Sequence, residues 1–192
     1  MSFEGVRAEP GDRAPAPGSL RLVQQFVNTL DNEGPELLPD AGALRDWLVA
    51  AELLDPRTQV GAADHRRAIE LREAIRALAE VHAGAPDDPA ATATVNETAR
   101  RAGLHPVLGE TSRLEPAAGG VDGALGRIVA AIHASIAEDT WPRLKACERH
   151  SCRWAFYDRS KNRSGHWCSM AVCGSREKNR RAYRRRVNPR SG

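Results

Sequence analysis

The sequence predicts a mostly α-helical protein, with a helical N-terminal domain followed by a small cysteine-bearing module. Apolar residues recur every three or four positions over long stretches of residues 20–138, which is the period of an amphipathic helix. All four cysteines of the 192-residue chain lie within its last 46 residues. Aromatic residues make up only 5% of the sequence, so the core must consist mainly of Leu, Val, Ile and Ala.

Before the first helix, residues 1–19 predict a flexible leader, because Pro and Gly are frequent there and apolar residues are few. This stretch has no apolar run of the kind that a secretory signal peptide requires. We also find no stretch that approaches the roughly 18–20 apolar residues of a membrane span. The expectation is therefore a soluble, cytoplasmic protein.

Residues 20–140 predict a helical domain of five helices, each with an apolar stripe and most with a Gly or Pro at the end. Residues 106–108 and 113–115 lack the helical period and predict a short β-hairpin between the fourth and fifth helices. The helices are one from Leu20 ended by Gly34-Pro35, one across residues 44–54 stopped by Pro56, one over residues 64–82 capped by Asp64, one over residues 90–102 ended by Gly103, and one over residues 121–138.

An enzyme in the helical domain is the weaker reading. The sequence contains no phosphate-binding loop, dinucleotide fingerprint, His-Glu-x-x-His pair or Gly-x-Ser-x-Gly elbow. Trp47, Asn28 and Asp31 are candidates for a ligand pocket, but packing and capping explain them better. The histidines of this domain are scattered, with no spacing that pairs one with a nucleophile: His65, His82, His105 and His133.

The cysteines form two equal pairs. Cys147 and Cys152 are separated by four residues, as are Cys168 and Cys173, and fifteen residues lie between the pairs. Two such knuckles brought together form a tetrahedral sulfur site, and four cysteines leave no open position for substrate. The pattern predicts one structural Zn²⁺, with an iron–sulfur cluster, two disulfides or free buried cysteines as alternatives.

Aromatic residues alternate between the two cysteine pairs. Trp154 and Phe156 fall on one face of a predicted strand, and residues 165–167 are expected to return as its partner strand. We interpret Trp154, Phe156 and Trp167 as the small core over the metal knuckles. Tyr157 is either part of that core or a platform on which a base stacks.

Opposite charges are concentrated in the two parts of the chain. Residues 141–192 carry 15 Lys+Arg and 3 Asp+Glu, a net charge of +12, whereas residues 1–140 carry 13 Arg and 22 acids, a net charge of −9. A helix is expected after Cys173, with Ser175 as its N-cap. The cationic side chains that predict nucleic-acid binding lie in the polar loop, Arg159, Lys161 and Arg163, and on that helix, Arg176, Lys178, Arg180, Arg181, Arg184 and Arg185.

The C-terminal residues resemble the CGNR-type zinc finger of bacterial proteins. The matching stretches are Leu144-Lys145-x-Cys147, Cys152-x-Trp154-x-Phe156, Asp158-x-Ser160-x-Asn162 and Trp167-Cys168-Ser169-Met170-x-x-Cys173-Gly174-x-Arg176. The segment Phe26-Val27-Asn28-Thr29-Leu30 is similar to the opening helix of the ABATE-type domain that precedes this finger.

This resemblance implies a transcription regulator whose helical domain senses a ligand or stress signal and whose finger binds zinc and DNA. It implies that the four cysteines are the metal ligands. The family signature has Asn where this chain has Ser175. If that Asn caps the helix, Ser does the same, and if it reads a base, the preferred sequence changes.

The domain organisation expected is therefore a leader of residues 1–19, a sensing or dimerising domain of residues 20–140, and a nucleic-acid-binding zinc module of residues 141–188. DNA is the expected partner, and RNA is the alternative. A small-molecule effector and a homodimer are further expectations. The opposed charges also suggest an autoinhibited state, in which the acidic domain docks on the basic tail and inhibits it.

Overall fold

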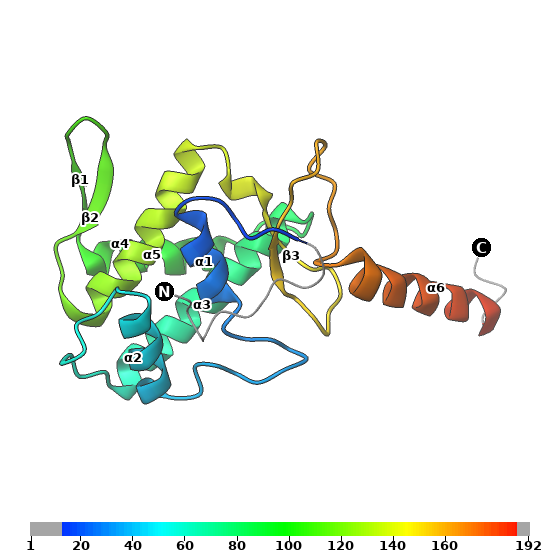
Figure 1. The fold of residues 1–192 in the computed structure, drawn as a ribbon, viewed down its shortest axis with the longest axis horizontal. Coiled ribbons are helices and arrows are strands. Elements are labelled where there is room, and N and C mark those ends of the chain that lie inside the picture. The colour runs from blue at the N-terminus through cyan, green and yellow to red at the C-terminus, as the bar shows by residue number, and fades with distance from the viewer. Residues whose placement is uncertain (1–12, 188–192) are drawn as a thin grey trace.

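A computed structural model of the chain describes residues 13–187 (Figure 1). It confirms the mostly α-helical class, with a short antiparallel hairpin between the fourth and fifth helices. The helical domain contains α1 (Leu20–Val27), α2 (Ala41–Ala50), α3 (Ala62–His82), α4 (Pro89–Ala102), β1 (Leu104–Val107), β2 (Arg113–Pro116) and α5 (Gly120–Ala137).

The C-terminal part begins four residues after the end of α5. It contains a 3-10 turn (Trp141–Arg143), β3 (Leu144–Ala146), β4 (Ala155–Tyr157), a π-helical segment (Met170–Gly174) and α6 (Ser175–Val187). Figure 1 shows α6 projecting away from the rest of the protein at one end of the molecule. In the described part of the chain, no helix combines the length and the apolar character needed to cross a lipid bilayer.

Capping side chains account for several helix boundaries. Helix α3 begins after Gly61, and the Asp64 carboxylate accepts a hydrogen bond from the Gly61 N–H at 2.8 Å. Asp64 therefore stabilises the start of α3 from inside its first turn, and it is not the N-cap residue that the sequence suggested. Helix α4 ends at Gly103, whose φ of 60° is the left-handed conformation that glycine adopts most readily.

Helix α1 is shorter than predicted. It ends at Val27, whereas the sequence suggested that it continues to Gly34-Pro35. Asn28 leaves the helix and uses its side chain to bind another segment, as described below. The Phe26 carbonyl at the helix end accepts from both the Thr29 hydroxyl at 2.8 Å and the Thr29 N–H at 3.3 Å.

One hydrophobic core joins the helical domain to the C-terminal part. Leu20, Phe26 and Ile128 are fully buried in it, and Leu144, Ala155 and Tyr157 of β3 and β4 belong to the same cluster. Near residue 140 the fold therefore changes from helices to short strands, but the side chains on both sides of this point pack in one core.

The segment predicted as a leader makes specific contacts from residue 13 onward; residues 1–12 lie outside the described residues. Ala16 is buried and its N–H donates to the Gln24 side chain at 2.7 Å. Arg13 donates to the carbonyl of Trp167 at 2.7 Å and lies 4.4 Å from the ring centroid of Phe156. Residues 13–19 thus connect α1 to the cysteine-bearing part.

Candidate metal centre and nucleic-acid surface

The four cysteines come from two knuckles. Cys147 follows β3 and Cys152 precedes β4, so the antiparallel pairing of these strands brings the first two sulfurs together. The Cys147 N–H donates to the Trp154 carbonyl at 2.9 Å, which closes the first knuckle. Cys173 lies in the π-helical segment, and its N–H donates to the Ser169 carbonyl at 2.9 Å.

The sulfur geometry fits one Zn²⁺. All four sulfurs lie within 4.8 Å of one another, and all four side chains are buried. The Cys152–Cys168 and Cys168–Cys173 sulfurs are 3.7 Å and 3.5 Å apart. A tetrahedral zinc with Zn–S bonds of about 2.3 Å requires sulfurs about 3.8 Å apart, whereas a disulfide requires about 2.05 Å. The cysteines are therefore suited to hold one zinc ion.

The pKa values of the cluster are consistent with a bound cation. Hydrogen bonds from the thiols of Cys152 and Cys168 lower the pKa of Cys147. Hydrogen bonds with Cys147 and Cys152 raise the pKa of Cys168 far above that of a free thiol. Because one ionised sulfur opposes ionisation of the next, four thiolates coexist here only around a positive ion.

Aromatic side chains cover the cluster as the sequence suggested. Trp154 and Phe156 are buried against the cysteines, and Trp167 packs on them while partly exposed. Tyr157, on the opposite face of β4, is buried in the core of the helical domain, so it is not a platform for a base.

The strand pairing differs from the prediction. Strand β4 pairs with β3, with Lys145 opposite Phe156, and residues 165–167 form no strand. One backbone hydrogen bond, from the Glu148 N–H to the His166 carbonyl at 3.0 Å, ties residue 166 to the first knuckle.

A buried ion pair shapes the polar loop. Lys145 and Asp158 lie 3.1 Å apart, and Asp158 is 1% exposed. Burial raises the pKa of Asp158, but hydrogen bonds from Ser160 and Gly165 and the Lys145 ammonium together lower it below its usual range. Lys145 also donates to the carbonyls of Arg163 and Gly165. The ion pair therefore holds both ends of residues 158–165.

We expect Gly165→Ala to destabilise this loop. A Cβ at Gly165 would lie 2.8–2.9 Å from the Asp158 carboxylate group, which is fixed by its hydrogen bonds. Overpacking of this kind costs about 1–3 kcal/mol of unfolding free energy, measurable by denaturant titration. Gly109→Ala is the control, since a Cβ there meets only an ordinary contact at 3.7 Å and should change stability by less than about 0.5 kcal/mol.

The structure places the predicted basic residues on two elements. Arg159 and Lys161 are exposed on the polar loop, and Arg163 is half-buried and paired with Asp139. Arg176, Lys178 and Arg180 are exposed on α6, where Arg180 makes two hydrogen bonds of 2.8 Å to Glu177. Arg181, Arg184 and Arg185 lie on the same helix, but their side chains are outside the described part of the structure.

Ser175 does not cap α6. Its backbone is already helical, with φ −65° and ψ −42°, because α6 continues directly from the π-helical segment. The cap is Ser169, whose hydroxyl accepts from the Val172 N–H at 3.3 Å. The exposed Ser175 hydroxyl donates instead to the Met170 carbonyl at 3.2 Å.

Gln24 of α1 and Asn28, the residue that follows this helix, bind the backbone of β4, and the sequence did not reveal this function. Asn28 donates to the carbonyl and accepts from the N–H of Ala155, both at 2.8 Å, as a neighbouring strand would. Gln24 donates to the same carbonyl at 3.2 Å. The only sign of it in the sequence is that two amide side chains, Gln24 and Asn28, lie four residues apart on the first predicted helix.

Arg76 is completely buried at the same junction. It donates to the carbonyls of Val27 at 2.7 Å and Arg153 at 2.9 Å, so one guanidinium binds the end of α1 and the residue after Cys152. Burial lowers the pKa of Arg76, while Glu73 at 3.2 Å favours the charge. Nearby, His82 contacts the Leu144 carbonyl at 2.9 Å.

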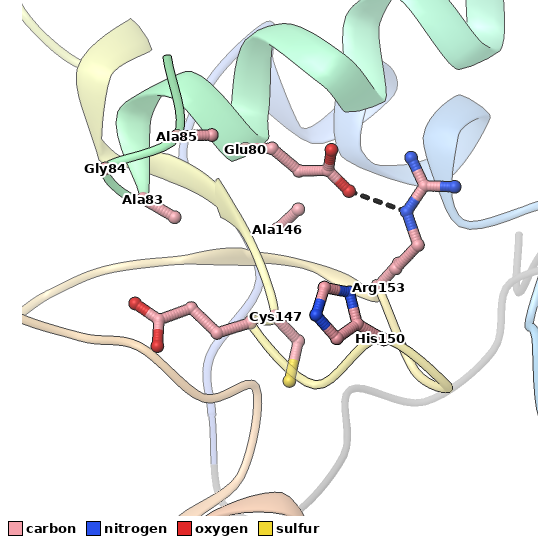
Figure 2. Close-up of a pocket in the computed structure, with 9 residues that line it drawn as sticks. Glu80, Ala83, Gly84, Ala85, Ala146, Cys147, His150 and Arg153 are labelled. Atoms are coloured by element: carbon pink, nitrogen blue, oxygen red, sulfur yellow. Dashed lines mark hydrogen bonds and ion pairs between the residues drawn. The ribbon is translucent and has the colours of Figure 1, made fainter.

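A pocket of about 360 Å³ lies where the C-terminal end of α3 meets the first knuckle (Figure 2). Glu80 and Arg153 form an ion pair of 2.6 Å at one side of the pocket. Figure 2 shows this pair with Cys147 and His150 below it. The pocket is therefore built from both parts of the protein.

A helical domain joined through a common core to a four-cysteine zinc module defines a zinc-finger protein. Residues 20–141 match the family model of ABATE, described as "Putative stress-induced transcription regulator", and residues 143–186 match the CGNR zinc finger. The chain belongs to the ABATE family. Both resemblances seen in the sequence are thereby confirmed, and neither family is an enzyme family. A comparison with curated proteins gives no match.

Proposed function

We propose that this protein is a zinc-dependent, DNA-binding transcription regulator of the cytoplasm, without enzymatic activity. The observation that carries the proposal is the position of α6. This cationic helix starts two residues after the fourth cysteine and extends away from the protein, so zinc binding would set the orientation of its exposed charges.

Duplex DNA suits this helix. Its 13 residues span about 20 Å, and the major groove is about 12 Å wide, enough to admit one helix. Arg176, Lys178 and Arg180 carry donors for phosphate and base edges. The polar loop adds Arg159 and Lys161, so contacts with the backbone of the DNA can be made from two elements.

RNA is the less favoured partner. Sequence-specific RNA recognition uses aromatic side chains on which unpaired bases stack. In the finger, Trp154 and Phe156 are buried in the small core and Tyr157 in the larger one. Tyr183 on α6 is exposed and remains available for stacking, so structured RNA belongs in the test as a competitor.

Three of the four histidines of the helical domain have structural partners. His65, His82 and His105 each contact a backbone carbonyl, of Leu38, Leu144 and Gly103 respectively. These contacts use one ring nitrogen of each histidine and favour a binding protein over an enzyme.

A response to a small molecule is supported by the pocket between α3 and the first knuckle. Its volume of about 360 Å³ falls in the range of ligand sites, and Glu80 and Arg153 offer both charges. A ligand held there would contact the helical domain and the residues around Cys147 together. This is where we place the effector.

The double variant Lys161→Gln, Lys178→Gln tests DNA binding. We expect fluorescence anisotropy to show at least about tenfold weaker binding to duplex DNA at 0.1 M salt, whatever the DNA sequence. The slope of log K against log salt should become shallower by about 0.9 for each lost phosphate contact.

The matched control is Arg100→Gln, Arg101→Gln, which removes the same charge from exposed positions on α4. It should leave DNA affinity within about twofold. An equal loss of DNA affinity in both variants would show that only the net charge of the protein matters, and would contradict a DNA-binding surface on α6 and the polar loop. Preference for structured RNA over duplex DNA at equal salt would favour the alternative.

A further inference from the structure

Glu33, in the loop between α1 and α2, contacts the basic face of the finger. Its carboxylate lies 2.5 Å from one nitrogen of Arg149 and 3.0 Å from another. Arg176 of α6 approaches the same carboxylate at 3.2 Å, and the Ser151 hydroxyl at 3.5 Å. An acidic residue of the helical domain is thus held by three side chains of the finger.

These three side chains form an anion cradle. Two guanidinium groups and a hydroxyl converge on one pair of oxygens, which is the donor set that a phosphate group binds. Arg149 also lies 3.9 Å from the Cys173 sulfur, so the metal centre helps to position it. A cavity of about 440 Å³ adjoins the cradle, lined by Arg149, His150, Ser151, Arg176, Glu177 and Arg180.

The carboxylate of Glu33 can be displaced. Its side chain is 38% exposed, and ion pairs of this exposure contribute only about 0.2–1 kcal/mol each. A second carboxylate in the cavity, Glu177, is already bound through two hydrogen bonds from Arg180. Removing Glu33 therefore leaves a net positive cavity that opens beside α6.

We propose that Arg149, Ser151 and Arg176 form a binding site for a backbone phosphate of duplex DNA, and that Glu33 occupies this site in the free protein. DNA binding then requires a phosphate to replace the Glu33 carboxylate. The helical domain thereby weakens DNA binding through one side chain. This inference rests on the proposed function and adds Arg149 and Ser151 to the residues expected at the DNA.

The test is Glu33→Gln in the full-length, zinc-loaded protein. Gln keeps the shape of the side chain but loses the charge, so DNA should bind about three- to tenfold more tightly at low salt. The ratio of the DNA affinity of Glu33→Gln to that of the unmodified protein should fall towards one as salt rises, because salt also weakens the ion pair of Glu33 with the finger. In an Arg176→Gln background, the gain from Glu33→Gln should be clearly smaller.

Glu115→Gln is the matched control. Glu115 is also paired with an arginine, Arg113, but both lie on the β1–β2 hairpin of the helical domain, so loss of this charge should leave DNA affinity within about twofold. Metal analysis should show one zinc per chain in every variant. An unchanged affinity of Glu33→Gln, or an equal gain in Glu115→Gln, would overturn the inference while the proposed function stands. Failure of the unmodified protein to bind DNA would contradict the proposed function instead.

Discussion

Removal of zinc is expected to unfold the C-terminal part and to abolish DNA binding. Structural zinc sites of this kind contribute on the order of 10 kcal/mol to folding at neutral pH. Without the ion, Cys168 is held as a neutral thiol, and the two knuckles lose the bonds that join them, so the small aromatic core over the cysteines has little left to hold it together. Because β3 and β4 also belong to the larger core, the helical domain should lose stability as well.

The measurement is thermal unfolding by circular dichroism, with metal content and DNA retention determined on the same samples. Chelator-treated protein should unfold at a clearly lower temperature, and added Zn²⁺ should restore both properties whereas Mg²⁺ should not. Cys168→Ser should reproduce the effect without a chelator. An unchanged unfolding temperature and unchanged DNA binding in metal-free protein would disprove the structural role of zinc.

Arg76→Met should be the most damaging single substitution outside the cysteines. The guanidinium is 0% exposed and binds the carbonyls of Val27 and Arg153. Met fills a similar volume but offers no donor, so two buried carbonyls lose this partner and Glu73 loses one of the two arginines that pair with it, keeping Arg72. Breaking a buried charged network in this way costs about 3–5 kcal/mol of unfolding free energy.

Arg66→Met provides the comparison, because Arg66 is exposed on the same helix. It should change the unfolding free energy by no more than about 0.5 kcal/mol. Denaturant titration of both variants with zinc bound separates the two effects. Similar values for Arg66→Met and Arg76→Met would show that the buried guanidinium does not hold the junction.

The helical domain could be predicted because each long helix has a consistent apolar period. Ala68, Leu71 and Ile75 were visible as one stripe of α3 and are buried. The same helix also buries Arg72 and Arg76, which no periodicity argument would place inside. Arg72 is accepted there because Glu36 pairs with it through two hydrogen bonds of 2.7 Å and 2.8 Å.

The metal site of the finger could be predicted from its cysteines alone, but the contacts that position the finger could not, because they involve residues far away in the sequence. Four cysteines at these spacings meet because the metal requires it. Strands β3 and β4 are only three residues long, and β4 is also bound by the side chains of Asn28 and Gln24, which come from a distant part of the sequence. Glu33 carries no motif, and its position over Arg149 is visible only in three dimensions.

Strand β4 has consequences for how this protein can evolve. Residues 154–157, which are β4 and the residue before it, alternate between two cores: Trp154 and Phe156 face the metal cluster, and Ala155 and Tyr157 face the helices. A finger built in this way is not an independent module that could be transferred on its own to another protein. Its transfer would also require Gln24, Asn28 and Arg76, so we expect the helical domain and the finger to be inherited together.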